Sequence, residues 1–206
     1  MSDLKDTFLI EKNAEQKIIV AGTMGVGKTT AIKTLCDSFR IDDSNHAEPL
    51  DCGTLFITGN DSEHNDNGEK LYFFASRKHS YSEPSLSESS WKKLQNGMIG
   101  ILLLIDNRRK DPLRDLQVFI EKFSDMDRQL AGKLVIGITH FDSSRTPAIT
   151  DFHAFIGNLE RKSGINPPIF SVDTRNFSDM SMLVQALLYT QNPRVNDLLS
   201  EELDFS

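Results

Sequence analysis

The sequence predicts an α/β fold in which a mostly parallel sheet of six strands carries helices on both faces. Short apolar runs with the composition of strands alternate with amphipathic helical segments, as a parallel sheet requires. Two of these runs, 53–59 and 69–75, are separated only by the polar stretch 60–68, which predicts one antiparallel hairpin strand. A glycine-rich loop follows the first strand, and it predicts a ligand site at the carboxyl ends of the strands.

The first predicted strand, Lys17–Ala21, leads through this loop into a helix over 29–37. The loop satisfies the phosphate-binding pattern G-x-x-x-x-G-K-[ST] and reads Gly22-Thr23-Met24-Gly25-Val26-Gly27-Lys28-Thr29, followed by Thr30. Its glycines allow backbone N–H groups to turn inward and meet phosphate oxygens at the positive end of the helix. We expect Lys28 to reach the outer phosphates as the first candidate catalytic residue, and the Thr29 hydroxyl to bind Mg²⁺. The alternative is a chance glycine-rich turn, which the agreement of strand, spacing and helix disfavours.

The later elements follow in order along the chain. Residues 40–50 are polar and predict a loop, and 76–90 are rich in hydroxyl groups and predict turns. The strand predicted at 100–106 is apolar on both faces, as a covered parallel strand is. The remaining predicted elements are a helix at 90–96 around Trp91 and Leu94, helices at 112–123, 150–162 and 179–191, and strands at 133–139 and 168–172. Thr150 is the expected cap of the helix at 150–162, and Gly164 its expected end.

Bulk properties narrow the classes of function. The 206 residues suffice for one domain, and we divide them into a lead-in at 1–16, a nucleotide-binding domain at 17–191 and an acidic tail at 192–206. The formal net charge of −7 argues against nucleic acid as a main partner, because phosphate backbones need a basic surface. Two cysteines and an acidic start predict a cytoplasmic protein with no signal peptide, and no apolar run is long enough to cross a bilayer.

The second chemical marker is Thr139-His140-Phe141-Asp142, directly after a predicted buried strand. A carboxylate at that position accepts hydrogen bonds from the ring nitrogen and exocyclic amine of guanine, a donor pair that adenine lacks. Asp142 therefore predicts selection of guanine. A helix cap or a solvated turn is the alternative role for an aspartate at a strand end.

At this point the chain resembles the small GTPase fold of the P-loop NTPases, whose guanine motif is [NT]-K-x-D. Thr139 and Asp142 match that motif, and His140 takes the place of the lysine. The nearest resemblance is to bacterial gliding-motility (Mgl)-type GTPases and GTP-binding proteins encoded beside roadblock-fold regulators. It covers 17–191 and includes the phosphate loop, Leu50-Asp51-Cys52-Gly53, the segment 91–106 and Ser171-Val172-Asp173. The resemblance implies GTP or GDP as ligand, Mg²⁺ as cofactor, a roadblock or longin-fold regulator as partner, and Ser171, Val172 and Asp173 beside the base.

The chain departs from the family's pattern in two places. The stretch before the second strand, 44–49, lacks the threonine that binds Mg²⁺ and senses the γ-phosphate, and Ser44 is a poor substitute. After the third strand, the glycine and the water-positioning glutamine of the family are absent from 75–80. We therefore expect very slow intrinsic hydrolysis. Arg77 or Lys78 is a candidate cationic finger and His79 a candidate water-orienting group, unless this basic triplet is a solvated loop or a partner surface.

Three functions stay open on the sequence. The first is a GTP-binding regulatory switch with weak or partner-dependent hydrolysis. The second is a pseudo-GTPase that holds nucleotide as an interaction scaffold. The third, a nucleotide kinase, would need an arginine-rich lid, and 108–110 is more simply a solvated loop than such a lid.

Overall fold

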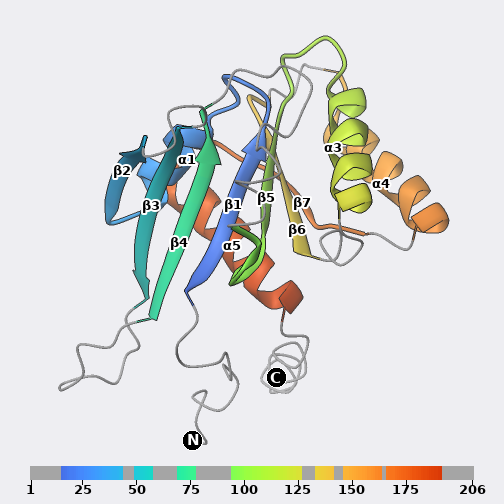
Figure 1. Ribbon diagram of the computed structural model, residues 1–206. Helices are drawn as coiled ribbons and strands as arrows, with labels where there is room; N and C mark the ends of the chain where they lie inside the picture. Colours follow the sequence, from blue (N-terminus) through green and yellow to red (C-terminus); the bar gives the residue numbers. More distant parts are fainter. Residues whose placement is uncertain are drawn as a thin grey trace, which may run out of the picture.

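The structure, a computed structural model, describes residues 15–43, 49–57, 69–77, 94–126, 133–141, 146–163 and 166–191 (Figure 1). Within these residues seven strands form one sheet in the order β2-β3-β4-β1-β5-β6-β7. The strands are β1 Gln16–Gly22, β2 Ser38–Asp42, β3 Leu50–Ile57, β4 Glu69–Ser76, β5 Met98–Asp106, β6 Leu134–Thr139 and β7 Ile169–Ser171. The helices are α1 Lys28–Leu35, α3 Pro112–Met126, α4 Ile149–Ser163 and α5 Phe177–Gln191.

The strand directions confirm the predicted fold class. β1 pairs in parallel with β4 and β5, and β6 pairs in parallel with β5 and β7. Only β3 among these strands runs against its neighbours, because it pairs antiparallel with both β2 and β4. One antiparallel strand in a mostly parallel sheet is thus confirmed, while the sheet has seven strands where six were predicted.

The additional strand is β2, and it overlaps the segment 40–50 that was predicted to be a loop. That prediction is wrong for Arg40–Asp42, which pair with Cys52, Asp51 and Leu50 of β3. β2 lies at the edge of the sheet, where a strand can be polar because only one of its sides is paired. Phe39 and Ile41 alternate with polar residues, but the pattern covers only five residues before a polar stretch, so it is a weak strand signal, and the pairing with β3 decides the conformation.

The sheet is the middle one of three layers, and its residues alternate between two cores. Ile19 and Ile101 face one side, where they pack with α3 and α4. Ile18 and Leu102 face the other side, where they pack with α1 and α5. β5 lies between β1 and β6 near the centre of the sheet (Figure 1). Eight of its nine residues are buried, which explains why the strand is apolar up to its last residue, Asp106.

Several predicted boundaries change in the structure. The cap predicted at Thr150 is wrong, because α4 begins at Ile149 and the Asp151 carboxylate accepts a hydrogen bond of 2.8 Å from the Ala148 N–H. The first hairpin strand covers Leu50–Ile57 and begins three residues before the predicted 53. Gly164, Trp91 and the tail 192–206 lie outside the described residues, whereas Leu94 is buried in the α3–α4 core as expected.

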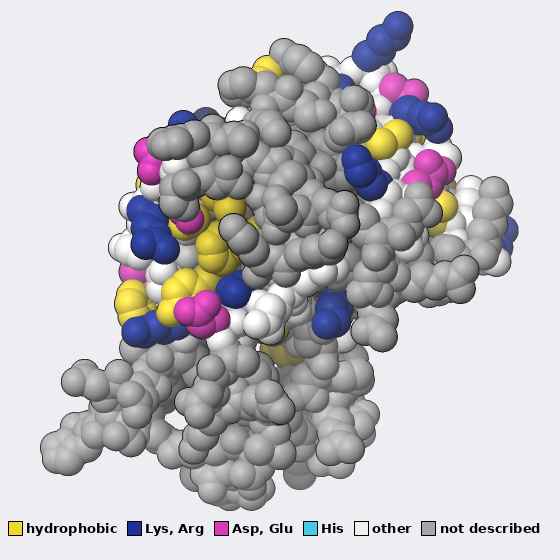
Figure 2. All heavy atoms as spheres, in the orientation of Figure 1, with side chains coloured by type: hydrophobic (Ala, Val, Ile, Leu, Met, Phe, Trp, Pro, Cys, Tyr) yellow, Lys and Arg dark blue, Asp and Glu magenta, His cyan; other side chains and the backbone are white. Residues whose placement is uncertain are grey.

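Some large apolar side chains are exposed on the surface. Figure 2 displays hydrophobic side chains between charged ones on the side of the molecule where β2, β3 and β4 lie in Figure 1. Ile41 of β2 and Phe56 of β3 are among the exposed large hydrophobic residues. None of the helices in the described part of the chain has the length and apolar character that crossing a bilayer requires.

Candidate functional site

The glycine-rich loop connects β1 to α1 at the carboxyl edge of the sheet. Gly25 has a φ of 77° and Gly27 a φ of 106°, values that side-chain-bearing residues rarely adopt. A Cβ on Gly27 would lie 2.7 Å from the Thr174 hydroxyl oxygen, so the loop also packs too closely for any side chain there. Gly27 caps α1 without a side-chain hydrogen bond, which leaves the helix N-terminus available to an anion.

Lys28 folds across this loop. Its Nζ donates hydrogen bonds to the carbonyl oxygens of Gly22, at 2.9 Å, and Thr23, at 3.0 Å. Burial lowers the pKa of Lys28 to about 8, although the nearby Asp51 carboxylate raises it in part. The loop therefore holds a cation that is only partly compensated, and phosphate oxygens would compensate it further.

Thr29 contacts a carboxylate that the sequence analysis did not single out. Its hydroxyl donates a hydrogen bond to Asp51 Oδ2, and the Asp51 side chain is 1% exposed. Asp51 Oδ1 lies 3.3 Å from Arg77 Nε. Residues 51 and 75 pair across β3 and β4, which places Asp51 and Arg77 beside the glycine-rich loop. The signal in the sequence was a lone carboxylate at the start of an otherwise apolar strand.

Two adjoining cavities surround the loop. The smaller one has a volume of about 300 Å³ and is lined by Met24, Gly25, Gly27, Lys28, Thr29, Thr30, Ser76 and Arg77. The larger one has a volume of about 660 Å³ and is lined by Gly25, Gly27, Thr30, Arg108, Thr139, His140, Phe141, Ser171, Val172, Asp173, Thr174, Arg175 and Asp179. They share Gly25, Gly27 and Thr30, so they adjoin at the loop.

His140 stands at the end of β6 in the larger cavity. Its φ of 53° is left-handed, which turns the chain sharply as it leaves the strand. His140 Nδ1 lies 3.1 Å from the Thr139 hydroxyl and 3.3 Å from Asp106 Oδ1. The Thr139 hydroxyl lies 3.2 Å from the Ile105 carbonyl oxygen and donates to it, so Thr139 fixes the strand end.

Two arginines flank His140 in the same local arrangement. Arg108 donates to the carboxylate of Asp106 through its backbone N–H, Nε and Nη2, at 2.9, 3.0 and 2.8 Å. Arg175 donates in the same way to Asp173, at 2.9, 2.9 and 2.7 Å. We call each of these an Asp-x-Arg clasp. One follows β5 and the other follows β7, so both stand on the edge that carries the ligand site, and Arg108 and Arg175 both line the larger cavity.

The clasps determine which charged groups face the larger cavity. Hydrogen bonds from Arg175 lower the pKa of Asp173 to about 2. Burial of Asp106 would raise its pKa, but the hydrogen bonds from Arg108 and the charge of His140 outweigh burial, and the pKa lies below its ordinary value. Both carboxylates are therefore ionised at neutral pH, and each arginine presents a guanidinium held in one plane.

Most of the residues predicted to bind a ligand meet at this edge. Thr139, His140, Ser171, Val172, Asp173 and most of the loop line the two cavities. Gly22, Thr23 and Val26 do not line them, and Thr23 and Val26 are buried. Arg77 lines the smaller cavity. Asp142, Lys78, His79 and Ser44 lie outside the described residues, so their predicted roles stay predictions.

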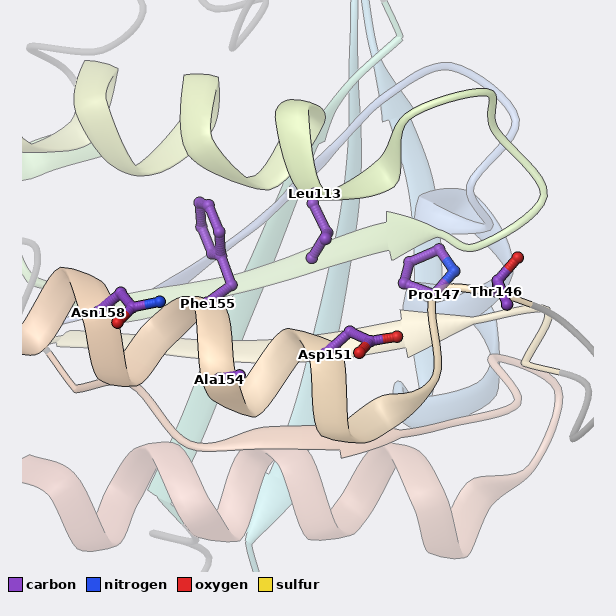
Figure 3. A pocket seen from close by; sticks show the side chains of 7 residues that line it. All are labelled: Leu113, Thr146, Pro147, Asp151, Ala154, Phe155 and Asn158. Carbon is purple, nitrogen blue, oxygen red and sulfur yellow. The ribbon is translucent and has the colours of Figure 1, made fainter.

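A further depression lies between α3 and α4, away from the loop (Figure 3). It has a volume of about 550 Å³ and is lined by Leu113, Thr146, Pro147, Asp151, Ala154, Phe155 and Asn158. Its one charged lining residue, Asp151, is engaged by the Ala148 N–H as described above. The convergent polar groups of a small-molecule site are thus gathered at the loop instead.

The sequence matches none of the protein families and none of the curated proteins with which it was compared. A solved structure does resemble this fold: a Plasmodium falciparum protein assigned as nucleolar GTP-binding protein 1 superposes with a TM-score of 0.58 at 16% identity. The match covers 92% of this chain and 94% of the other. The chain therefore shares the fold of that protein, an α/β sheet that is mostly parallel, with one antiparallel strand and helices on both faces.

Proposed function

We propose that the chain binds a guanine nucleotide with Mg²⁺ at the carboxyl edge of the sheet and acts as a small GTPase-like regulatory switch. The observation that carries this proposal is that the two cavities adjoin at the phosphate loop, with Lys28 lining one and His140 lining the other. Their volumes, about 300 and 660 Å³, suit phosphates on the narrow side and a nucleoside on the wide side. The structural neighbour is assigned as GTP-binding, which agrees with the proposal.

The residues around Thr29 suit Mg²⁺. This cation takes oxygen ligands, and the Thr29 hydroxyl and the Asp51 carboxylate supply them side by side. Asp51 Oδ1 accepts no hydrogen bond within the described residues, although it is buried. No group of three or more His, Cys, Asp or Glu side chains gathers around a metal position in the described ranges, so the nucleotide phosphates would complete the coordination. When bound, the cation neutralises charge on the phosphates.

The chain's own residues would divide the work of binding. Loop N–H groups and Lys28 hold the phosphates, because the loop places a helix N-terminus and an ammonium at one point. His140 and the two Asp-x-Arg clasps border the nucleoside. Asp142 would read the guanine edge, as predicted from the sequence. We expect slow hydrolysis because the water-positioning glutamine is missing. Arg77 lines the smaller cavity together with Lys28, and it is the candidate for stabilising the transition state.

Nucleotide binding tests this proposal directly. Purified protein should retain GDP or GTP, and labelled GTP should bind with micromolar or tighter affinity while ATP competes poorly. Lys28→Ala should abolish binding, whereas Lys33→Ala, in the same helix but outside both cavities, should leave it unchanged. Equal affinity for ATP and GTP would contradict the assignment of guanine, and no affinity for either would overturn the proposal.

A pseudo-GTPase scaffold is the second candidate, and the pairing of Arg77 with Asp51 favours it. Arg77 occupies the region after β4 where the resembled family has a glycine that meets the γ-phosphate, and here its guanidinium faces a buried carboxylate. Single-turnover hydrolysis, with and without a roadblock or longin-fold regulator, separates the two candidates. Turnover that Lys28→Ala abolishes would exclude the scaffold, and complete absence of turnover in both conditions would favour it.

A further inference from the structure

Asp51 is a buried carboxylate that the phosphate loop alone does not explain. It comes from β3, a strand on the far side of β4 from the loop-bearing β1. Its side chain is 1% exposed, and removing a carboxylate from water is costly unless strong partners replace the water. The described partners are the Thr29 hydroxyl at Oδ2 and the Arg77 guanidinium 3.3 Å from Oδ1. The Arg77 side chain is itself 44% exposed, so the side of Asp51 that Arg77 faces is the side nearest to solvent.

We propose that Asp51 is a magnesium-binding residue that acts together with Thr29 and replaces the threonine missing from the segment before β3. This inference rests on the proposed function. Asp51 Oδ2 contacts the Thr29 hydroxyl, and hence any cation bound by that hydroxyl lies within reach of the same carboxylate. Asp51 Oδ1 has no hydrogen bond to lose within the described residues. Magnesium in nucleotide sites is commonly held by one or two carboxylates together with phosphate oxygens, and Asp51 supplies one.

The charges around Asp51 agree with this role. The Asp51 carboxylate faces two cations, Lys28 and Arg77, although neither forms a hydrogen bond with it. A dication placed between Asp51 and the phosphates would compete with Arg77 for the carboxylate. Because Arg77 is half-exposed at the end of β4, its side chain can turn into solvent without disturbing a core. Binding of a metal ion at Asp51 would thus change the position of the Arg77 side chain.

A purely structural role makes a different prediction. If Asp51 served only to anchor Arg77, then removing either partner would have the same effect on nucleotide binding. If Asp51 binds the metal, the loss of Asp51 weakens only the magnesium-dependent part of nucleotide retention. Arg77 should not share that effect, because a guanidinium binds no cation.

The experiment measures dissociation of a fluorescent GDP analogue from the full chain in Mg²⁺ and in excess EDTA. Wild type should release the nucleotide much more slowly in Mg²⁺. Asp51→Asn, which keeps the shape and removes the charge, should release it about 10- to 100-fold faster than wild type in Mg²⁺ and at the wild-type rate in EDTA. Arg77→Ala removes the guanidinium that competes for Asp51, so the ratio of the release rates in EDTA and in Mg²⁺ should be at least as large as in wild type. Glu160→Gln, which removes one exposed negative charge on α4, is the matched control.

Several results would overturn the inference. A wild-type ratio of rates in Asp51→Asn, or an equal loss in Arg77→Ala, would make Asp51 an anchor only. Should Asp51→Asn fail to fold, wild-type protein labelled with ¹³C-carboxyl aspartate and loaded with Mn²⁺–GDP gives an independent reading by electron–nuclear double resonance. A coupling between Mn²⁺ and a carboxylate carbon supports the inference, and its absence overturns it. Failure of wild type to bind nucleotide in either buffer would instead overturn the proposed function itself.

Discussion

Arg108 and Asp106 are joined by three hydrogen bonds that leave the guanidinium flat against the carboxylate and beside the larger cavity. The arrangement uses only residues two apart in the chain, so it depends on the turn that follows β5 and not on packing from distant elements. The second clasp repeats it after β7. This repetition gives the larger cavity two positioned arginines.

Loss of the first clasp should weaken nucleotide binding. A guanidinium held in one plane can stack on a base, and such stacking contributes about 1–3 kcal/mol per base. Arg108→Ala should therefore reduce the affinity for GDP about tenfold, as measured by titration calorimetry. Arg114→Ala removes an arginine of α3 that lies outside the cavity and should change the affinity little. Equal losses in the two variants would contradict a specific role for Arg108.

The ion pair of the first clasp also predicts an acid-dependent stability. The pKa of Asp106 is lower in the folded protein than its ordinary value of about 3.9. Its contribution is therefore present above pH about 4 and is lost as the pH falls through the lower folded pKa. Asp106→Asn should cost about 1–3 kcal/mol in the free energy of unfolding at pH 7.

Urea unfolding at pH 7 and pH 3 checks this expectation, provided that the chain is still folded at pH 3. The cost of Asp106→Asn should be smaller at pH 3, because the Asp106 carboxyl of the unfolded wild type is then largely protonated and folding has to release that proton. Glu160→Gln should show no such difference between the two pH values. A constant cost at both values would mean that Asp106 acts without its charge.

Because of Lys28, the affinity for nucleotide should fall at alkaline pH. Its pKa in the free protein is about 8, and bound phosphates would raise it because they favour the protonated amine. The complex then holds more protons than the free protein above pH 8, so affinity falls as the pH rises beyond that value.

Affinity measured from pH 7 to pH 9.5 checks this prediction. Below pH about 8 we expect a nearly constant affinity, followed by a decline that approaches tenfold per pH unit. Lys33→Met should preserve the decline, since Lys33 lies outside both cavities. An affinity that stays flat to pH 9.5 would show that Lys28 remains protonated in the free protein.

Two glycines should respond in opposite ways to the same substitution. A Cβ on Gly53 would lie 2.5 Å from Cys36 Sγ and 2.5 Å from Ile32 Cγ2, where β3 packs on α1. Gly53→Ala should thus destabilise the fold by about 1–3 kcal/mol. A Cβ on Gly157 in α4 would meet nothing within 4 Å, and Gly157→Ala should stabilise by about 0.5–1 kcal/mol. Thermal unfolding of the two variants measures both effects, and a shift of the same sign in both would contradict this reading of the packing.

The sequence sufficed for the features that repeat with a short period or depend on local spacing. The phosphate loop is contiguous, and β5 is apolar on both faces, so both could be predicted. β2 was not predicted, because its alternation of Phe39 and Ile41 with polar residues is short and is followed by a polar stretch, and its pairing with β3 decides its conformation. The cap of α4 was misplaced for a related reason: Thr150 and Asp151 are both good capping residues, and only the backbone geometry selects between them.

Many residues of the candidate site could be predicted from the sequence, but the contacts between them could not. Thr139, His140 and Ser171 could be placed at one edge from the strand order alone, which is a property of topology. Asp51 could not be assigned a role, because its meeting with Thr29 depends on the register of β3 against β4. The Asp-x-Arg clasps were overlooked because 108–110 was interpreted as a solvated loop, although the exposed Arg108 is held by a buried neighbour.

The close approach of Gly27 to Thr174 has a mechanical consequence. The start of α1 rests on the turn that leads into α5, and both helices pack on the same face of the sheet. A residue larger than glycine at position 27 would therefore have to displace the Thr174 side chain, and with it the connection that leads into α5. Helices α3 and α4 pack on the other face of the sheet and take no part in this contact.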